Sequence, residues 1–129
     1  QETEQLEFKY PGSPDGSLTE SIVTATCKAI CAMANSGGGY VFIGITQDNR
    51  ISGVRLTYNN RPRELDEMQR LILPQHCRFQ PDVPVDCMWP IQIAPDRYVF
   101  AFYISRKTRQ VWEYNGKRYV RRGTQSIVR

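Results

Sequence analysis

The sequence has little that would support several common kinds of chemistry. Its single histidine, His76, closely follows the helix-breaking Pro74, so no convincing Ser-His-Asp or Cys-His nucleophile can be assembled. No apolar run reaches the ~18–20 residues that a membrane span needs, so no membrane partner is expected. No signal peptide, internal repeat or low-complexity tract is visible.

Cysteine is also scarce, with four residues in the chain. Cys27 and Cys31 are four residues apart on a predicted helix, which is an awkward geometry for a disulfide. We therefore expect reduced thiols, as in a cytoplasmic or nuclear protein.

The size and composition are those of one ordinary globular domain. The 129 residues are 40% hydrophobic and 23% charged, which is enough apolar material for a core. We take residues 1–129 as a single domain. Because the first residue is Gln, we expect it to be a fragment of a longer chain.

Charge is unevenly distributed along the chain. Residues 1–48 carry six acidic and two basic side chains, a balance of −4, whereas residues 97–129 carry nine basic and one acidic, a balance of +8. An acidic N-terminal part and a basic C-terminal part would suit a protein that binds a polyanion close to a cation-binding site. A solvated basic hairpin would give the same pattern.

Hydrophobic periodicity predicts an α+β fold, with two helices on a mixed, mainly antiparallel sheet. Ser17 and Glu20 form a capping-box pattern at the start of the first helix, and the run 40–45 predicts a strand buried on both faces. The expected strands are 6–10, 40–45, 51–54, 85–93, 98–104, 111–114 and 117–120, and the helices are 17–34 and 61–73.

The glycine-rich segment 35–39 does not predict a phosphate-binding loop. Such loops run from a strand through glycines into a helix, whose N-terminus then faces the anion. Here the order is reversed, and no Gly-Lys-Ser/Thr follows. A tight helix-to-strand turn is the simpler interpretation.

Several motifs, in this order and spacing, resemble the Schlafen core, the Alba-like domain of the Schlafen superfamily. They are Glu-Phe-Lys at 7–9, Ala-Ile-Cys-Ala-Met-Ala-Asn-Ser-Gly-Gly-Gly at 29–39, Tyr-Val-Phe-Ile-Gly-Ile at 40–45, Ile-Ser-Gly-Val at 51–54 and Tyr-Val-Arg-Arg-Gly-Thr at 119–124. The resemblance implies a metal-dependent endoribonuclease acting on structured RNA, such as tRNA or small-RNA precursors, including piRNA precursors.

The same resemblance implies a three-carboxylate site for Mg²⁺ or Mn²⁺, which prefer oxygen ligands. Glu2 and Glu7 have the family's five-residue spacing, and Lys9 matches its lysine as electrostatic support. The expected aspartate falls at Thr46, so Asp48 is the candidate third ligand. Asp48 can serve if the strand continues past position 46, and cannot if a turn begins there. On this view Glu7→Ala would abolish cleavage and leave the fold intact.

A zinc site is a second metal hypothesis. Vertebrate Schlafens are similar in carrying a His/Cys zinc site in this region, and His76, Cys77 and Cys87 could supply ligands. The spacing lacks a Cys-x-x-Cys pair, and a fourth ligand would have to come from elsewhere. A surface histidine and a buried Cys87 is the alternative.

The basic C-terminal third supplies the candidate nucleic-acid contacts. They are Arg106, Lys107, Lys117, Arg118, Arg121 and Arg122. Trp112, Tyr114 and Tyr119 interleave with them, and stacking combined with phosphate pairing suits RNA. Strand alternation assigns some of these aromatic rings to the core.

Three functional hypotheses remain open. The first is a metal-dependent endoribonuclease domain, and the second is a non-catalytic nucleic-acid-binding or scaffolding subunit that pairs with an active Schlafen-like chain. A pure protein-interaction domain is the third, and it leaves the basic hairpin unexplained. In the first two we expect structured RNA as the ligand and a homodimer or a heterodimer with another Schlafen-like chain.

Overall fold

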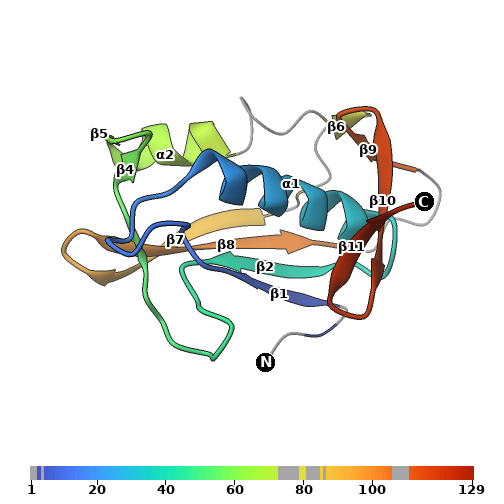
Figure 1. Cartoon of the computed structure of the whole chain (residues 1–129), viewed down its shortest axis with the longest axis horizontal. Coiled ribbons are helices and arrows are strands. Elements are labelled where there is room, and N and C mark those ends of the chain that lie inside the picture. Colours follow the sequence, from blue (N-terminus) through green and yellow to red (C-terminus); the bar gives the residue numbers. More distant parts are fainter. Residues whose placement is uncertain (1–2, 4, 73–78, 81–84, 86, 106–110) are drawn as a thin grey trace.

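The computed structural model describes residues 3, 5–72, 79–80, 85, 87–105 and 111–129. Helix α1 and the short helix α2 accompany eleven strands in this part of the chain (Figure 1). The elements are β1 Leu6–Lys9, α1 Glu20–Ala34, β2 Gly39–Ile43, β3 Val54–Arg55, β4 Thr57–Tyr58, β5 Arg61–Pro62, α2 Leu65–Ile72, β6 Phe79–Gln80, β7 Cys87–Ala94, β8 Arg97–Ile104, β9 Glu113–Tyr114, β10 Lys117–Arg122 and β11 Gln125–Val128.

The larger sheet is mixed. Its order is β1-β2-β8-β3, with β7 also paired to β8. The β1–β2 pair is parallel, whereas β2, β3 and β7 all run antiparallel to β8. A second sheet has the order β11-β10-β9-β6, and β4 pairs with β5. The expected α+β class, mainly antiparallel with two helices, is confirmed.

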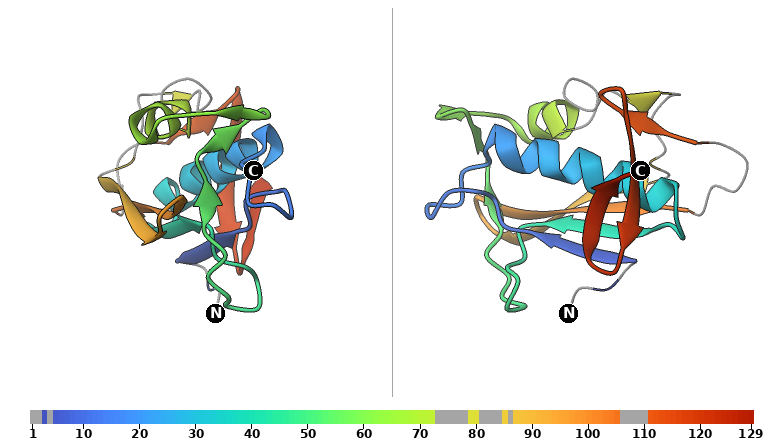
Figure 2. Two further views of the ribbon diagram at one scale, coloured as in Figure 1. Left: turned by 90° about the vertical axis from the view of Figure 1, so that its left-hand side faces the viewer. Right: turned by 45° about the vertical axis from the view of Figure 1, so that its right-hand side comes forward.

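Helix α1 covers one face of the larger sheet (Figure 1). Val41, Ile43, Phe100 and Phe102 point into this interface and are fully buried. The expectation that the run 40–45 is buried on both faces is wrong, because Tyr40 on the opposite face is 43% exposed. No described helix covers that face, and the loop 44–53 projects from it, away from α1 (Figure 2).

The start of α1 differs from the expected capping box. The helix begins at Glu20 with Thr19 as its N-cap, and Thr19 makes no side-chain capping bond. The backbone N–H of Leu18 donates to the carbonyl of Thr57 at 3.1 Å, so the chain is still held extended there. A long-range backbone contact therefore delays the helix by two residues beyond the expected Ser17 cap.

The second helix is shorter than the expected 61–73. Asn59 and Asn60 both have positive φ, 53° and 61°, which is the geometry of a two-residue hairpin turn. This turn joins β4 to β5, and α2 begins only at Leu65. The Asn115-Gly116 hairpin was predicted and is confirmed, whereas β11, which follows Gly123, was not predicted.

The cysteines differ among themselves. The expectation of reduced thiols is wrong for Cys27, which is disulfide-bonded. Cys31 is a free thiol, and burial raises its pKa. Neither α1 nor α2 is long and apolar enough to cross a membrane, and no other described segment forms such a helix.

Candidate nucleic-acid interface

The C-terminal hairpin is fixed to the end of α1 by Asn35. Its side-chain amide donates to the carbonyls of Trp112 at 2.7 Å and Tyr119 at 2.8 Å, and its Oδ1 accepts the N–H of Trp112 at 2.8 Å. The next residue, Ser36, accepts the backbone N–H of Arg121 at 3.0 Å. The sequence predicted only a helix-to-strand turn at residues 35–39. In the structure, Asn35 and Ser36 of this segment also hold the basic hairpin in place.

A buried ion pair joins the first strand to this hairpin. Arg121 Nη1 lies 2.9 Å from Glu7 Oε1, with the two side chains 0% and 5% exposed. The same guanidinium donates to the carbonyl of Thr3 at 2.9 Å and to Ser126 Oγ at 3.3 Å. The negative charge of Glu7 is therefore balanced by the guanidinium group of Arg121.

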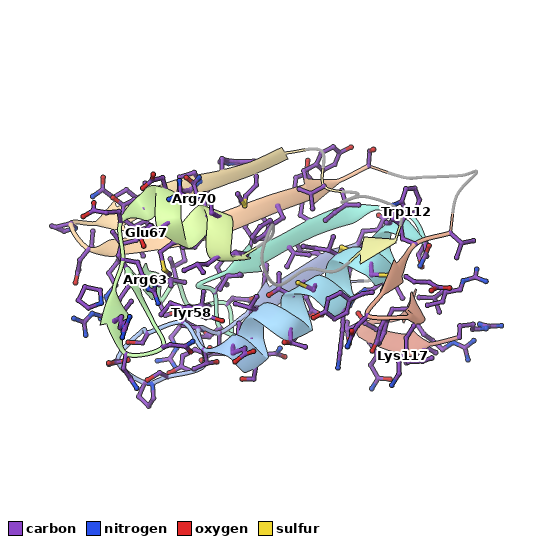
Figure 3. All side chains as sticks on the ribbon, turned by 90° about the horizontal axis from the view of Figure 1, so that it is seen from above. Tyr58, Arg63, Glu67, Arg70, Trp112 and Lys117 are labelled. Atoms are coloured by element: carbon purple, nitrogen blue, oxygen red, sulfur yellow. The ribbon has the colours of Figure 1, made fainter. Side chains whose placement is uncertain are left out.

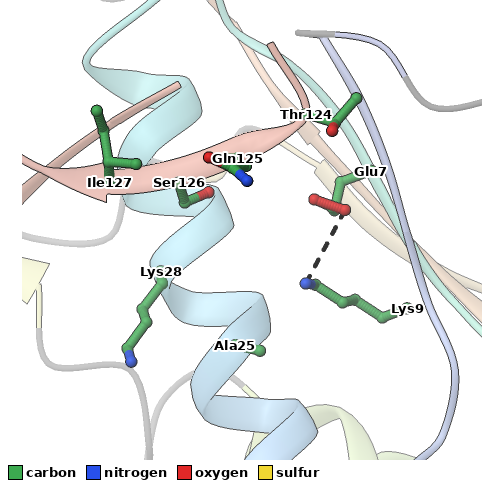
Figure 4. Close-up of a pocket in the computed structure, with 8 residues that line it drawn as sticks. All are labelled: Glu7, Lys9, Ala25, Lys28, Thr124, Gln125, Ser126 and Ile127. Atoms are coloured by element: carbon green, nitrogen blue, oxygen red, sulfur yellow. Dashed lines mark ion pairs between the residues drawn. The ribbon is translucent and has the colours of Figure 1, made fainter. Parts of the chain in front are cut away.

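Glu7 also lines a cavity of about 380 Å³ between β1, α1 and the final hairpin (Figure 4). Lys9 Nζ stands 3.9 Å from Glu7 Oε2. Lys28 lines the same cavity from α1, together with Ala25 and residues 124–127. The cavity wall thus brings one carboxylate together with two ammonium groups.

Asp48 lies in a turn beyond the end of β2. The N–H of Asn49 bonds to the carbonyl of Thr46, and the hydroxyl of Thr46 donates to the Asp48 carboxylate, which lowers the pKa of Asp48. Arg50 Nε lies 2.9 Å from Asp48 Oδ2 on the exposed surface. A turn thus begins at this point, and for a turn the sequence analysis predicted that Asp48 cannot act as a metal ligand.

The described residues do not fit a divalent cation. No three His, Cys, Asp or Glu side chains in the described ranges are grouped as ligands. Glu7 is occupied by Arg121, with Lys9 nearby, and Asp48 is paired with Arg50. Glu2, His76 and Cys77 lie outside the described residues, as does the side chain of Cys87, so the three-carboxylate and zinc hypotheses stay predictions.

A basic pocket of about 500 Å³ is built on the outer face of β10. Arg118 and Arg122 are exposed on this strand, and Arg129 joins them because its N–H bonds to the carbonyl of Arg118 at 2.9 Å. Ser36, Val120 and Arg121 complete the lining. Within the described part of the chain, Arg118, Arg122 and Arg129 form no ion pair, although Glu113 on β9 lies directly opposite Arg118. We call this set Arg118, Arg122 and Arg129 the arginine pocket.

Several other arginines in the domain are paired with acids, whereas the described residues Arg61 and Arg97 form no ion pair. On α2 and just before it, Arg70 contacts Asp66 at 3.2 Å and Arg63 contacts Glu67 at 3.8 Å. Figure 3 shows this group at the opposite end of the domain from Lys117 and Trp112. Around α2 the arginines thus have their own acids, whereas the arginine pocket forms no ion pair among the described residues.

The predicted nucleic-acid residues separate into distinct groups. Lys117, Arg118 and Arg122 are exposed, whereas Arg121 is buried in its ion pair, and Arg106 and Lys107 lie outside the described residues. The interleaved aromatic residues all belong to the core, with exposed fractions of 5–7%: Trp112, Tyr114 and Tyr119. Sequence reasoning missed Arg129, although its position in the basic third was a usable signal.

The geometry is that of an α+β domain with a basic face at one end. The sequence profile of the family described as Schlafen, AlbA_2 matches residues 2–128, so the chain belongs to this family, which is nucleic-acid related. A comparison with curated proteins gave no match.

A similar fold is found in a solved structure, that of the DIP2311 protein from Corynebacterium diphtheriae. The TM-score is 0.65 at 17% sequence identity. The match covers 98% of this chain and 22% of the solved chain, so this chain spans about a fifth of that protein's length. At this identity the likeness shows the fold alone.

Proposed function

We propose that this domain binds RNA through the arginine pocket and acts as a nucleic-acid-binding subunit without cleaving the strand itself. The supporting observation is that Arg118, Arg122 and Arg129 converge on one pocket and form no ion pair among the described residues. Guanidinium groups bind phosphates in bidentate geometry and stay charged at all physiological pH values.

The position of Glu7 supports the non-catalytic part of this proposal. Oε1 of Glu7 accepts a hydrogen bond from Arg121 at 2.9 Å, so a cation could bind through Oε2 alone unless Oε1 were freed from Arg121. Freeing it would leave a buried guanidinium unpaired, which is costly.

The test measures binding of a fluorescent RNA by anisotropy over a range of salt concentrations. Arg118→Gln and Arg122→Gln should each weaken binding and lower the log–log salt slope by about 0.7–0.9 per lost phosphate contact. Arg70→Gln is the matched control, because it removes the same charge from the α2 end, where Arg70 already pairs with Asp66. Equal effects of all three variants would overturn the proposal.

A second candidate is the metal-dependent endoribonuclease acting on tRNA or small-RNA precursors, with Glu2, Glu7 and Asp48 as ligands for Mg²⁺ or Mn²⁺. It is favoured by the open cavity in which Glu7 and Lys9 stand together. Glu7→Gln would then abolish both RNA cleavage and calorimetric Mn²⁺ binding, while Glu64→Gln, at an exposed acid just before α2, would change neither. Failure of the wild type to bind Mn²⁺ would exclude this candidate.

We further propose that the domain works as a dimer, with itself or with another Schlafen-like chain. The arginine pocket is small beside the ~16 base pairs that a duplex-binding domain covers, so a second domain would extend the surface. Strand pairing through β7 is a poor route, because Pro90 removes a backbone donor in the middle of that edge strand. Light scattering should give twice the monomer mass.

A further inference from the structure

The open face of the larger sheet carries an exposed aromatic cluster. Tyr40 and Phe42 on β2 and Tyr103 on β8 point away from α1, and Tyr40 and Tyr103 are directly paired across the strands. Their ring centroids are 5.0 Å apart, and the rings of Tyr40 and Phe42 are 6.2 Å apart and nearly parallel, at 12°. We call Tyr40 and Tyr103 the tyrosine pair.

The tyrosine pair forms one wall of a cavity of about 520 Å³. Gln5, Leu6 and Gly37 line it as well. The side-chain amide of Gln5 lies beside Gly37, where it can reach a ligand's polar edge. Proteins recognise an unpaired base with this combination of groups. Aromatic rings stack on the face of the base, and an amide forms hydrogen bonds with the edge of the base.

This cavity adjoins the arginine pocket. Ser36 lines the arginine pocket and Gly37, the next residue, lines the tyrosine cavity. Consecutive Cα atoms are about 3.8 Å apart, so the two surfaces meet at the turn between α1 and β2. A single strand crossing this turn would place phosphates on the arginines and a base on the tyrosines.

We propose that the tyrosine pair is a stacking site for an unpaired base of a nucleic acid whose phosphates occupy the arginine pocket. The proposal deepens the function proposed above and rests on it. The tyrosines stand on two paired strands of the sheet, so little side-chain ordering is needed when a base binds. A fully paired duplex would gain nothing from this site, because its bases are stacked on one another.

The neighbouring charge favours a nucleic acid over a protein as the occupant. On β7 the same face continues with Trp89 and Ile91, which are 39% and 41% exposed. The tyrosine part is the one that borders the arginine pocket. Aromatic rings next to unpaired arginines are typical of single-strand binding surfaces.

The experiment compares two single-stranded probes of roughly 12 nucleotides, within the ~4–16 that such sites cover. One is an RNA and the other an abasic strand of the same length, which keeps the phosphates and lacks the bases. The wild type should prefer the RNA, and Tyr40→Leu combined with Tyr103→Leu should reduce RNA affinity by on the order of 5- to 100-fold. The abasic strand should bind the wild type and the tyrosine variants alike, and the salt slope should not differ between them.

Two further variants make the result specific. Tyr40→Phe keeps the ring and should retain most of the affinity. Tyr10→Leu, at a tyrosine of similar exposure that lines neither cavity, should bind like the wild type. Circular dichroism melting of each variant shows that the fold is retained.

The outcomes separate this inference from the function on which it rests. Loss of binding to both probes in Arg118→Gln and Arg122→Gln, with no effect of the tyrosine variants, would overturn the stacking site and leave the arginine pocket in place. A tyrosine variant that halves the sedimenting mass without changing RNA affinity would reassign the face to a protein contact and also overturn the inference.

Discussion

The buried pair between Glu7 and Arg121 makes the sharpest prediction about stability. Arg121→Met removes the guanidinium but keeps most of the apolar stem, so the buried Glu7 loses the cation at 2.9 Å, while Lys9 remains at 3.9 Å. Breaking a buried pair in this way costs about 3–5 kcal/mol. That is a large part of the ~5–15 kcal/mol by which domains of this kind are stable.

Urea denaturation followed by far-UV circular dichroism measures the effect. With a urea m-value of about 1–3 kcal/mol/M, the midpoint should fall by about 1–5 M. Arg122→Met is the matched control, because Arg122 is the adjacent residue on β10 and is exposed. Its free energy of unfolding should stay within about 0.5 kcal/mol of the wild type.

The double variant Glu7→Leu/Arg121→Met tests the pairing itself. Removing both charges avoids an isolated buried ion, so its stability should recover part of the loss. The recovery is incomplete because the carbonyl of Thr3 and the hydroxyl of Ser126 also lose a partner, at about 1 kcal/mol each. A loss below about 1 kcal/mol in Arg121→Met, with no coupling to Glu7, would refute the reasoning.

Three further predictions concern the framework of the site. Asn35→Ala should lower the free energy of unfolding by about 2–4 kcal/mol in the same assay, because it removes three hydrogen bonds, to the N–H and carbonyl of Trp112 and to the carbonyl of Tyr119. Gly39→Ala should destabilise the domain by more than about 2 kcal/mol, because the added Cβ would lie 2.3 Å from the carbonyl oxygen of Gln5 and φ is +148°. Hydrogen bonds, first from the backbone N–H of Ser17, lower the pKa of Asp15 from 3.8 to about 2. The stability advantage of the wild type over Asp15→Asn should therefore be present above pH 3.8 and disappear as the pH falls to about 2, as melting temperatures of both proteins will show.

Local patterns in the sequence were sufficient for the main elements. The apolar spacing from Ile22 to Ala34 predicted the body of α1, and Asn115-Gly116 predicted the hairpin. Both signals act over a few residues, through helical periodicity and the positive φ of a two-residue turn. The helix start and the β4–β5 hairpin were missed, the first because Leu18 is held by Thr57, almost forty residues away.

Exposure of the sheet was harder to predict than its strands. A continuous apolar run predicts burial on both faces only if something covers the second face. In this domain the rings of Tyr40 and Phe42 pack partly against each other and against a neighbouring strand. Aromatic side chains can thus give a half-open strand the sequence appearance of a buried one.

The uneven charge of the sequence has two different meanings in the structure. The acidic front and the basic back partly neutralise each other, because Glu7 and Arg121 pair across 114 positions. Alternation on β10 then separates the arginines, with Arg121 turned inward to Glu7 and Arg118 and Arg122 turned outward. Net charge alone cannot distinguish an arginine that is buried in an ion pair from one that is exposed and can bind a phosphate. That distinction depends on which face of β10 each side chain lies on, and on the position in which Asn35 holds the hairpin. Arg118 and Arg122 are therefore the residues whose replacement should weaken RNA binding without destabilising the fold.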